Sequence, residues 1–246
     1  MEAATTGIGE RVMAVRAKIA AACQRAGRSP DSVTLVAVSK THPAPRVVEA
    51  IQAGVWHLGE NRIEEALPKM AEMMKLADTL VSWHMVGHVQ SRKARYLTAG
   101  FALLHSLDSV RLAERLSRHV VEQQRVLDVL LEMNVSGEVS KEGWEASRWR
   151  DDPALRRALW ADVARVLALP GLNVRGLMTM APLVDDPEAA RPVFAALRDL
   201  RDALAGDFPN MEWPDLSMGM TDDYPVAVEE GATLVRLGRA IFGARS

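Results

Sequence analysis

The sequence predicts a single (β/α)₈ barrel with an extra helix at its N-terminal end. Strand-like apolar segments alternate with helix-like segments eight times along the 246 residues, and no linker-like stretch divides the chain. Barrels of this type commonly form one domain of roughly 250 residues. An open doubly wound sheet is the alternative, but its usual glycine-rich turn after the first strand is replaced here by Ser39-Lys40-Thr41. We therefore expect residues 1–246 to form one domain, with residues 1–27 as a helix packed on the barrel.

The predicted elements follow one another in a regular order. Apolar residues at helical spacing run from Ile8 to Ala22, and Gly27 ends this first helix. The eight predicted strands are rich in the β-branched and large apolar residues that suit a sheet covered on both faces, and they comprise residues 33–38, 55–58, 81–87, 102–107, 126–134, 172–178, 215–218 and 232–237. Helical segments are predicted after them at 46–53, 59–76, 90–98, 108–124, 152–169, 185–203 and 222–230, with a closing turn at 239–243.

Start and stop signals support these boundaries. Prolines stop the first strand, because proline lacks the amide that a central strand needs. Acidic residues followed by proline are typical of the first turn of a helix. The signals used are Pro43 and Pro45 for the first strand, Gly59-Glu60-Asn61-Arg62 for the second barrel helix, and Asp152-Pro153, Asp185-Asp186-Pro187 and Asp222-Asp223-Tyr224-Pro225 for later helices.

Composition excludes several classes of protein. The formal charge is −2 and no dense cluster of lysine and arginine occurs, so binding to nucleic acid is not expected. No apolar run approaches the roughly 18 residues that a membrane span requires, and the first ten residues lack the layout of a signal peptide. Cys23 is the single cysteine, which agrees with a reducing compartment. We expect a soluble, cytoplasmic protein without membrane partners.

The strongest chemical signal is a lysine at the end of the first strand. Lys40 would be costly inside a core, so we expect it at the mouth of a pocket, where a lysine can form a Schiff base with a carbonyl compound. The alternative is a lysine that caps the strand and points into water. Barrel closure makes the first and eighth strands neighbours and brings Arg236 close to Lys40. Two cations at one pocket would lower the pKa of the lysine and favour an anionic ligand. The alternative for Arg236 is a salt bridge to Glu229 or Glu230.

The loops after the seventh and eighth strands commonly bind phosphate in such barrels. These loops are Ser217-Met218-Gly219-Met220-Thr221 and Leu237-Gly238-Arg239, which offer hydroxyls and small residues. Each glycine taken singly is equally consistent with an ordinary turn. A lysine for an aldehyde, an arginine and a phosphate loop together describe a site for pyridoxal phosphate.

Other polar residues give weaker signals. His84 and His88 have the i, i+4 spacing of a helical metal pair, but the segment is predicted to be a strand, so no metal site is expected. Asn61 follows the second strand and either reaches the pocket or only caps the next helix. The Trp-rich segment that contains Trp144, Trp149 and Trp160 is expected to pack over a local hydrophobic patch.

Several motifs in order resemble the pyridoxal phosphate homeostasis protein family, the single-domain relatives of the alanine racemase N-terminal barrel. The similarity runs from about residue 8 to the C-terminus. The motifs are residues 35–41 (LVAVSKT), 58–62 (LGENR), 83–90 (WHMVGHVQ), 216–223 (LSMGMTDD) and 235–243 (VRLGRAIFG). The segment between residues 143 and 174 is about ten residues longer than in the family, so we expect the loop after the fifth strand to cover the pocket differently.

The resemblance implies a bound pyridoxal 5'-phosphate and a role for each matching residue. Lys40 would carry the aldehyde and Arg236 would face the pyridine nitrogen. Ser217, Gly238 and the backbone of Arg239 would hold the phosphate. Asn61 is implied to line the pocket.

Three functions fit this site. The expected one is a protein that stores or delivers the cofactor, with cofactor-dependent apoenzymes as possible recipients, acting as a monomer or weak homodimer. A racemase is the alternative, but it needs a second acid or base from another domain, and the sequence has two tyrosines, Tyr96 and Tyr224. A third reading is a Schiff-base lyase for a phosphorylated sugar.

Overall fold

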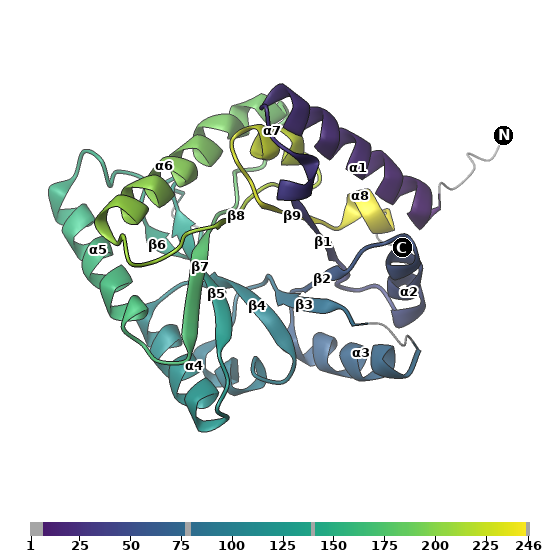
Figure 1. Cartoon of the computed structure of the whole chain (residues 1–246), viewed down its shortest axis with the longest axis horizontal. Helices are drawn as coiled ribbons and strands as arrows, with labels where there is room; N and C mark the ends of the chain where they lie inside the picture. Colours follow the sequence, from purple (N-terminus) through teal and green to yellow (C-terminus); the bar gives the residue numbers. More distant parts are fainter. Residues whose placement is uncertain (1–6, 77–79, 139–140, 245–246) are drawn as a thin grey trace.

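The strands form a closed parallel barrel. The computed structural model describes residues 7–76, 80–138 and 141–244. Its strands are β1 (Thr34–Val38), β2 (His57–Glu60), β3 (Ser82–Met85), β4 (Phe101–Leu107), β5 (Leu127–Asn134), β6 (Trp144–Glu145), β7 (Leu172–Met178), β8 (Asp215–Ser217) and β9 (Leu234–Leu237). They follow the order β4-β3-β2-β1-β9-β8-β7-β5, with β6 beside β5, and the pairing of β4 with β5 closes the ring. The predicted (β/α)₈ fold class is confirmed (Figure 1).

The helical elements surround this ring. They are α1 (Ile8–Arg25), α2 (Ala44–Gln52), α3 (Ile63–Leu76), η2 (Ser91–Tyr96), α4 (Val110–Glu122), α5 (Pro153–Leu167), α6 (Arg191–Asp207), α7 (Tyr224–Glu229) and α8 (Arg239–Phe242), with the short 3₁₀ turns η1 (Pro30–Ser32) and η3 (Pro187–Ala190). The segment after β3 is a 3₁₀ helix, where the sequence predicts an ordinary helix over 90–98. Ala94 is the buried residue of η2, so this segment has little apolar surface with which packing could stabilise an α-helix.

The extra N-terminal helix packs on the outside of the barrel. Its predicted apolar stripe, from Ile8 to Ala22, is buried, and α1 contacts α2, α7 and α8 (Figure 1). Cys23 is fully buried in the same face, and burial raises the pKa of its thiol. A buried thiol with a raised pKa is poorly nucleophilic, so Cys23 has a packing role.

Apolar side chains fill two layers, one inside the barrel and one between the strands and the helices. On β1, Val36 belongs to the interior cluster, whereas Ala37 belongs to the outer layer. Side chains alternate along a strand. Val38 therefore lies on the interior side too. The chain leaves β1 after Val38, so Lys40 lies in the turn that follows the carboxyl end of the strand.

The Trp-rich segment folds beside the barrel. Trp144 pairs with Met133 of β5 through the short strand β6, which the sequence analysis did not predict. Trp149 and Trp160 pack with ring centroids 5.7 Å apart, so these two residues form the expected local patch. Among the helices of the described residues, none is long and apolar enough to cross a membrane.

Candidate functional site

A cavity of about 260 Å³ opens at the carboxyl ends of the strands. Its size is near the lower end of the range for small-molecule sites, about 300–1,000 Å³. The polar lining residues come from β9 and from the segments after β1, β2, β8 and β9, and the apolar walls come largely from valine and methionine side chains. The lining comprises Val38, Lys40, His42, Asn61, Val86, Met180, Leu183, Met220, Thr221, Asp222, Arg236, Gly238, Arg239 and Gly243.

Five of the six predicted site residues line this cavity, namely Lys40, Asn61, Arg236, Gly238 and Arg239. They come from four different loops or strands, and the closed barrel brings them together. The sixth residue, Ser217, lies elsewhere, as described below.

A buried ion pair holds the turn that carries Lys40. Lys69 of α3 donates from Nζ to the carbonyl oxygen of Ser39 at 2.8 Å and to Oε1 of Glu60 at 2.6 Å. The Ser39 hydroxyl donates to the same Glu60 oxygen at 2.7 Å. The amide of the next residue, Thr41, donates to Glu65, and Thr41 has a positive φ of 67°. A positive φ is unfavourable for threonine, so these contacts hold the turn in a conformation that the isolated chain would avoid.

This arrangement also shows where Glu60 points. Its side chain is fully buried and contacts Ser39 and Lys69, while the neighbouring Asn61 lines the cavity. Gly87, after β3, allows this placement, because a Cβ there would lie 2.4 Å from the carbonyl oxygen of Asn61.

Arg236 is the buried cation at the floor of the cavity. It is 5% exposed, and its guanidinium donates to Oγ of Ser217 at 2.6 Å and to the carbonyl oxygen of Thr179 at 2.9 Å. Burial lowers its pKa to about 10, and the carboxylates of Glu132 and Asp223 oppose this effect. Arg236 therefore remains a cation at neutral pH. Its pairing register with Val36 of β1 confirms that barrel closure places it beside the strand that leads to Lys40.

The alternative assignment of Arg236 to a surface salt bridge is wrong. Glu229 pairs with Arg25 and Arg191, and Glu230 pairs with Arg191 and Arg198. Both glutamates lie at the end of α7, outside the barrel interior where Arg236 is bound.

The structure places Ser217, the sixth predicted residue, beside Arg236. Its side chain is fully buried at the end of β8, does not line the cavity, and is bonded to Arg236 and His105. The hydroxyl that does line the cavity from this loop belongs to Thr221, four residues further on. Oγ1 of Thr221 accepts from the amide of Ala240 at 3.3 Å, which joins the loop after β8 to the start of α8. The same two loops are also joined by the ion pair of Arg239 with Asp222.

Three histidines form a chain inside the barrel that the sequence analysis did not identify. His57 Nδ1 lies 3.0 Å from His84 Nε2, His84 Nδ1 lies 2.8 Å from His105 Nε2, and His105 Nδ1 lies 2.7 Å from the Ser217 hydroxyl. Burial lowers the pKa of all three, that of His84 to about 3. One feature of the sequence could have revealed this chain, because three consecutive strands, β2, β3 and β4, each carry one histidine.

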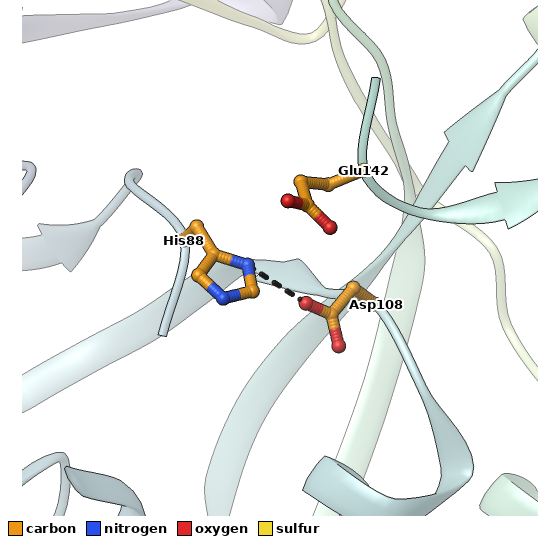
Figure 2. Close-up of side chains that lie close together, drawn as sticks. All are labelled: His88, Asp108 and Glu142. Atoms are coloured by element: carbon orange, nitrogen blue, oxygen red, sulfur yellow. Dashed lines mark ion pairs between the residues drawn. The ribbon is translucent and has the colours of Figure 1, made fainter. Parts of the chain in front are cut away.

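His88, the other half of the apparent metal pair, belongs to a different cluster. Its Nδ1 lies 3.0 Å from Oδ2 of Asp108, and the Glu142 carboxylate points toward both (Figure 2). The potential ligand atoms of the three residues lie within 4.8 Å of one another. His88 and Glu142 are exposed, and the ion pair accounts for the position of the histidine, so we assign no metal to this cluster.

The fold and the cavity define a barrel of the alanine racemase class, and the alanine racemase N-terminal domain family matches residues 11–246. A pyridoxal phosphate homeostasis protein from Pseudomonas aeruginosa is 44% identical over 238 residues, with 97% of this chain and 96% of the relative covered. One from Aquifex aeolicus is 40% identical over 236 residues, with 96% and 97% covered. The chain therefore belongs to the pyridoxal phosphate homeostasis protein family.

A solved relative agrees with this assignment. The structure of PipY from Synechococcus elongatus PCC7942 with pyridoxal phosphate bound is 38% identical and superimposes with a TM-score of 0.79. The alignment covers 96% of this chain and 100% of that chain.

Proposed function

We propose that this protein binds pyridoxal 5'-phosphate as a Schiff base on Lys40 and stores or delivers it, without robust turnover of amino acids. The observation that supports this most is the convergence of Lys40 and Arg236 on one cavity with a hydroxyl-bearing loop at its rim. The names of the relatives and the pyridoxal phosphate in PipY support the same cofactor.

The residues of the cavity fit the chemical groups of this cofactor. The Lys40 amine would condense with the aldehyde, so that a C=N bond replaces the C=O bond and the oxygen leaves as water, and Arg236 would donate to the pyridine nitrogen. We propose that Ser217, Gly238 and the backbone of Arg239 hold the phosphate together with the Thr221 hydroxyl, and that the Ser217 side chain also supports Arg236. Asn61 lies at the cavity wall, where it can contact the ring. When bound, pyridoxal phosphate supplies an electron-withdrawing ring conjugated to the imine.

The residues around the ring favour storage over catalysis. Arg236 remains protonated and only donates hydrogen bonds, so it keeps the pyridine nitrogen unprotonated and the ring a weak electron sink. Racemisation also needs a second acid or base near the substrate. Tyr224 is buried at the start of α7, Tyr96 lies on η2, and neither lines the cavity. His42 lines it and its ring stacks on Phe242 with centroids 4.8 Å apart, so the racemase alternative would have to use this imidazole.

The binding proposal is tested by the visible absorbance of the purified protein after incubation with pyridoxal phosphate and removal of the unbound cofactor by gel filtration, before and after borohydride. We expect a band that borohydride abolishes, that Lys40→Ala lacks, and that the control Lys75→Ala on the exposed face of α3 retains. A band retained by Lys40→Ala would overturn the assignment of the lysine. The absence of any band would favour the sugar-phosphate lyase.

The storage role is tested separately with the loaded protein. Mixing it with a cofactor-dependent apoenzyme should restore the activity of that enzyme. Robust racemisation of amino acids by the pure protein would instead support the racemase. We also propose that the protein is a monomer or weak homodimer, which sedimentation analysis would measure directly.

A further inference from the structure

The chain of three histidines runs through the interior of the barrel toward the cavity. His57 is the first residue of β2, His84 the third of β3 and His105 the fifth of β4, so each histidine lies further along its strand than the one before. The chain ends on Ser217, which accepts from Arg236. A continuous row of hydrogen bonds therefore connects the amino ends of the strands with the cavity floor.

The direction of every hydrogen bond in this row follows from its Ser217 end. Arg236 can only donate, so the Ser217 oxygen accepts from it. Among the described residues, Nδ1 of His105 is the other partner of this hydroxyl, so the hydroxyl hydrogen is directed to it. A neutral imidazole that accepts at Nδ1 carries its hydrogen on Nε2. His105 therefore donates to Nδ1 of His84, and His84 donates in turn to Nδ1 of His57. All three histidines are fixed in the Nε2–H tautomer.

We propose that His57, His84 and His105 are positioning residues for Arg236, and that the protonation state of His57 sets the direction of the whole chain. Such a chain would link the pH at the amino-terminal face of the barrel with the affinity for pyridoxal phosphate of the cavity at the opposite face. This proposal rests on the proposed function only in taking Arg236 as a contact of the cofactor.

His57 is the end of the chain that solvent can reach. It is half-buried and lines a cavity of about 430 Å³ at the start of β1 and β2, whereas the other two histidines are buried. The charged groups that line this cavity are Arg16 of α1 and Asp31 of η1. The residues in register with His57 on β1 and β3, Val36 and Ser82, are uncharged. A proton can therefore reach His57 without passing through the core.

Protonation of His57 reverses the direction of the hydrogen bonds along the chain. Protonated His57 carries a hydrogen on Nδ1, which then faces the Nε2–H of His84 across 3.0 Å. Two donors cannot bond to each other, so either this contact opens or His84 and His105 both move their hydrogens to Nδ1. Ser217 must then accept from His105 as well as from Arg236. The added positive charge also repels Arg236 through the low-dielectric interior.

The first test measures tautomers in the protein without cofactor, by ¹⁵N NMR of histidine-labelled protein between pH 5 and 8. At pH 8 we expect His57, His84 and His105 in the Nε2–H form. As His57 titrates, the ¹⁵N shifts of His84 and His105 should change with the same midpoint. His57→Asn keeps an acceptor near the Nδ1 position but does not titrate, so it should abolish that step. A different tautomer at pH 8, or resonances of His84 and His105 that ignore the titration of His57, would overturn the proposal.

The second test measures the affinity for pyridoxal phosphate over the same pH range. His57→Asn should bind like the wild type at pH 8 and better than it below the midpoint. His105→Phe should bind about ten-fold more weakly at pH 8, the effect of losing one hydrogen bond in a charged network. His105→Gln, which can accept from Ser217 and donate to His84, should restore most of the affinity. If neither the wild type nor the variants bind the cofactor, the proposed function is contradicted. The tautomers measured by NMR in the protein without cofactor would be unaffected by that result.

For both tests, His119→Phe on α4 is the matched control, because this histidine lies on the outer surface beside Glu122. It should change neither the tautomers nor the affinity. Equal pH profiles for the wild type and His57→Asn would show that His57 does not act on the cavity and would contradict the proposal.

Discussion

Replacing Glu132 by glutamine should stabilise the protein in a pH-dependent manner. Glu132 lies on β5, is 4% exposed, and has one carboxylate oxygen, Oε2, without a hydrogen-bond partner. Burial raises its pKa from 4.5 to about 7, the carboxylates of Asp108 and Glu142 add to this effect, and Arg236 opposes it. Because the pKa in the folded state is raised, the folded protein binds this proton more tightly than the unfolded chain does.

The sign and size of the effect follow from linkage. The stabilisation from the Glu132 proton is complete below pH 4.5 and is lost as the pH rises through about 7. The pKa difference corresponds to roughly 3 kcal/mol of free energy of unfolding. Glu132→Gln has no such proton to lose. Relative to the wild type, it should therefore be more stable at pH 8.5 than at pH 5 by up to about 3 kcal/mol.

Denaturation in urea at these two pH values measures this difference directly. Glu72→Gln, at an exposed position on α3, is the matched control and should show no pH-dependent change relative to the wild type. The reasoning would be refuted if the difference in free energy of unfolding between Glu132→Gln and the wild type were the same at pH 5 and pH 8.5. That result would mean that Glu132 has the same pKa in the folded and unfolded states.

Two further predictions concern the frame around the site. Lys69→Met leaves Glu60 as a buried charge without its cation, so it should lower the free energy of unfolding by about 3–5 kcal/mol, and adding Glu60→Gln should recover part of the loss. A loss below 1 kcal/mol in urea would contradict this. Gly176 has a φ of 155°, and a Cβ there would lie 1.9 Å from the Asp215 carbonyl oxygen, so Gly176→Ala should prevent the pairing of β7 with β8. Gly206→Ala, at an open position of α6, should instead stabilise the fold by up to about 1 kcal/mol, and equal melting temperatures for the two variants would refute the comparison.

Two general properties made much of the site predictable from the sequence: side chains alternate along a strand, and the strands close into a barrel. The apolar run that ends at Lys40 indicated a buried strand, and the position of a lysine at its end indicated a pocket. Closure of the barrel then placed Arg236 beside β1, as the register between Val36 and Arg236 confirms. Both inferences needed only the period of a strand and the number of strands.

The parts that could not be predicted depend on where a strand ends and which side chains meet across the barrel. Ser217 is the last residue of β8 and Thr221 lies in the loop that follows, and the sequence alone does not show that the Thr221 hydroxyl lines the cavity. The contact of His105 with Ser217 joins β4 and β8, which are not paired strands. Their sequence separation of 112 residues leaves no local pattern. Strand β6 is two residues long, too short for a periodic signal.

The central claim, that Lys40 carries pyridoxal phosphate, is tested most directly by borohydride reduction of the loaded protein followed by peptide mass mapping. Reduction turns a Schiff base into a stable amine, so the modified lysine keeps the added pyridoxyl phosphate mass. The account predicts that this mass occurs on the peptide that contains Lys40 and is lost from that peptide in Lys40→Ala. Stoichiometric labelling of another lysine in the wild type, with Lys40 unmodified, would contradict it.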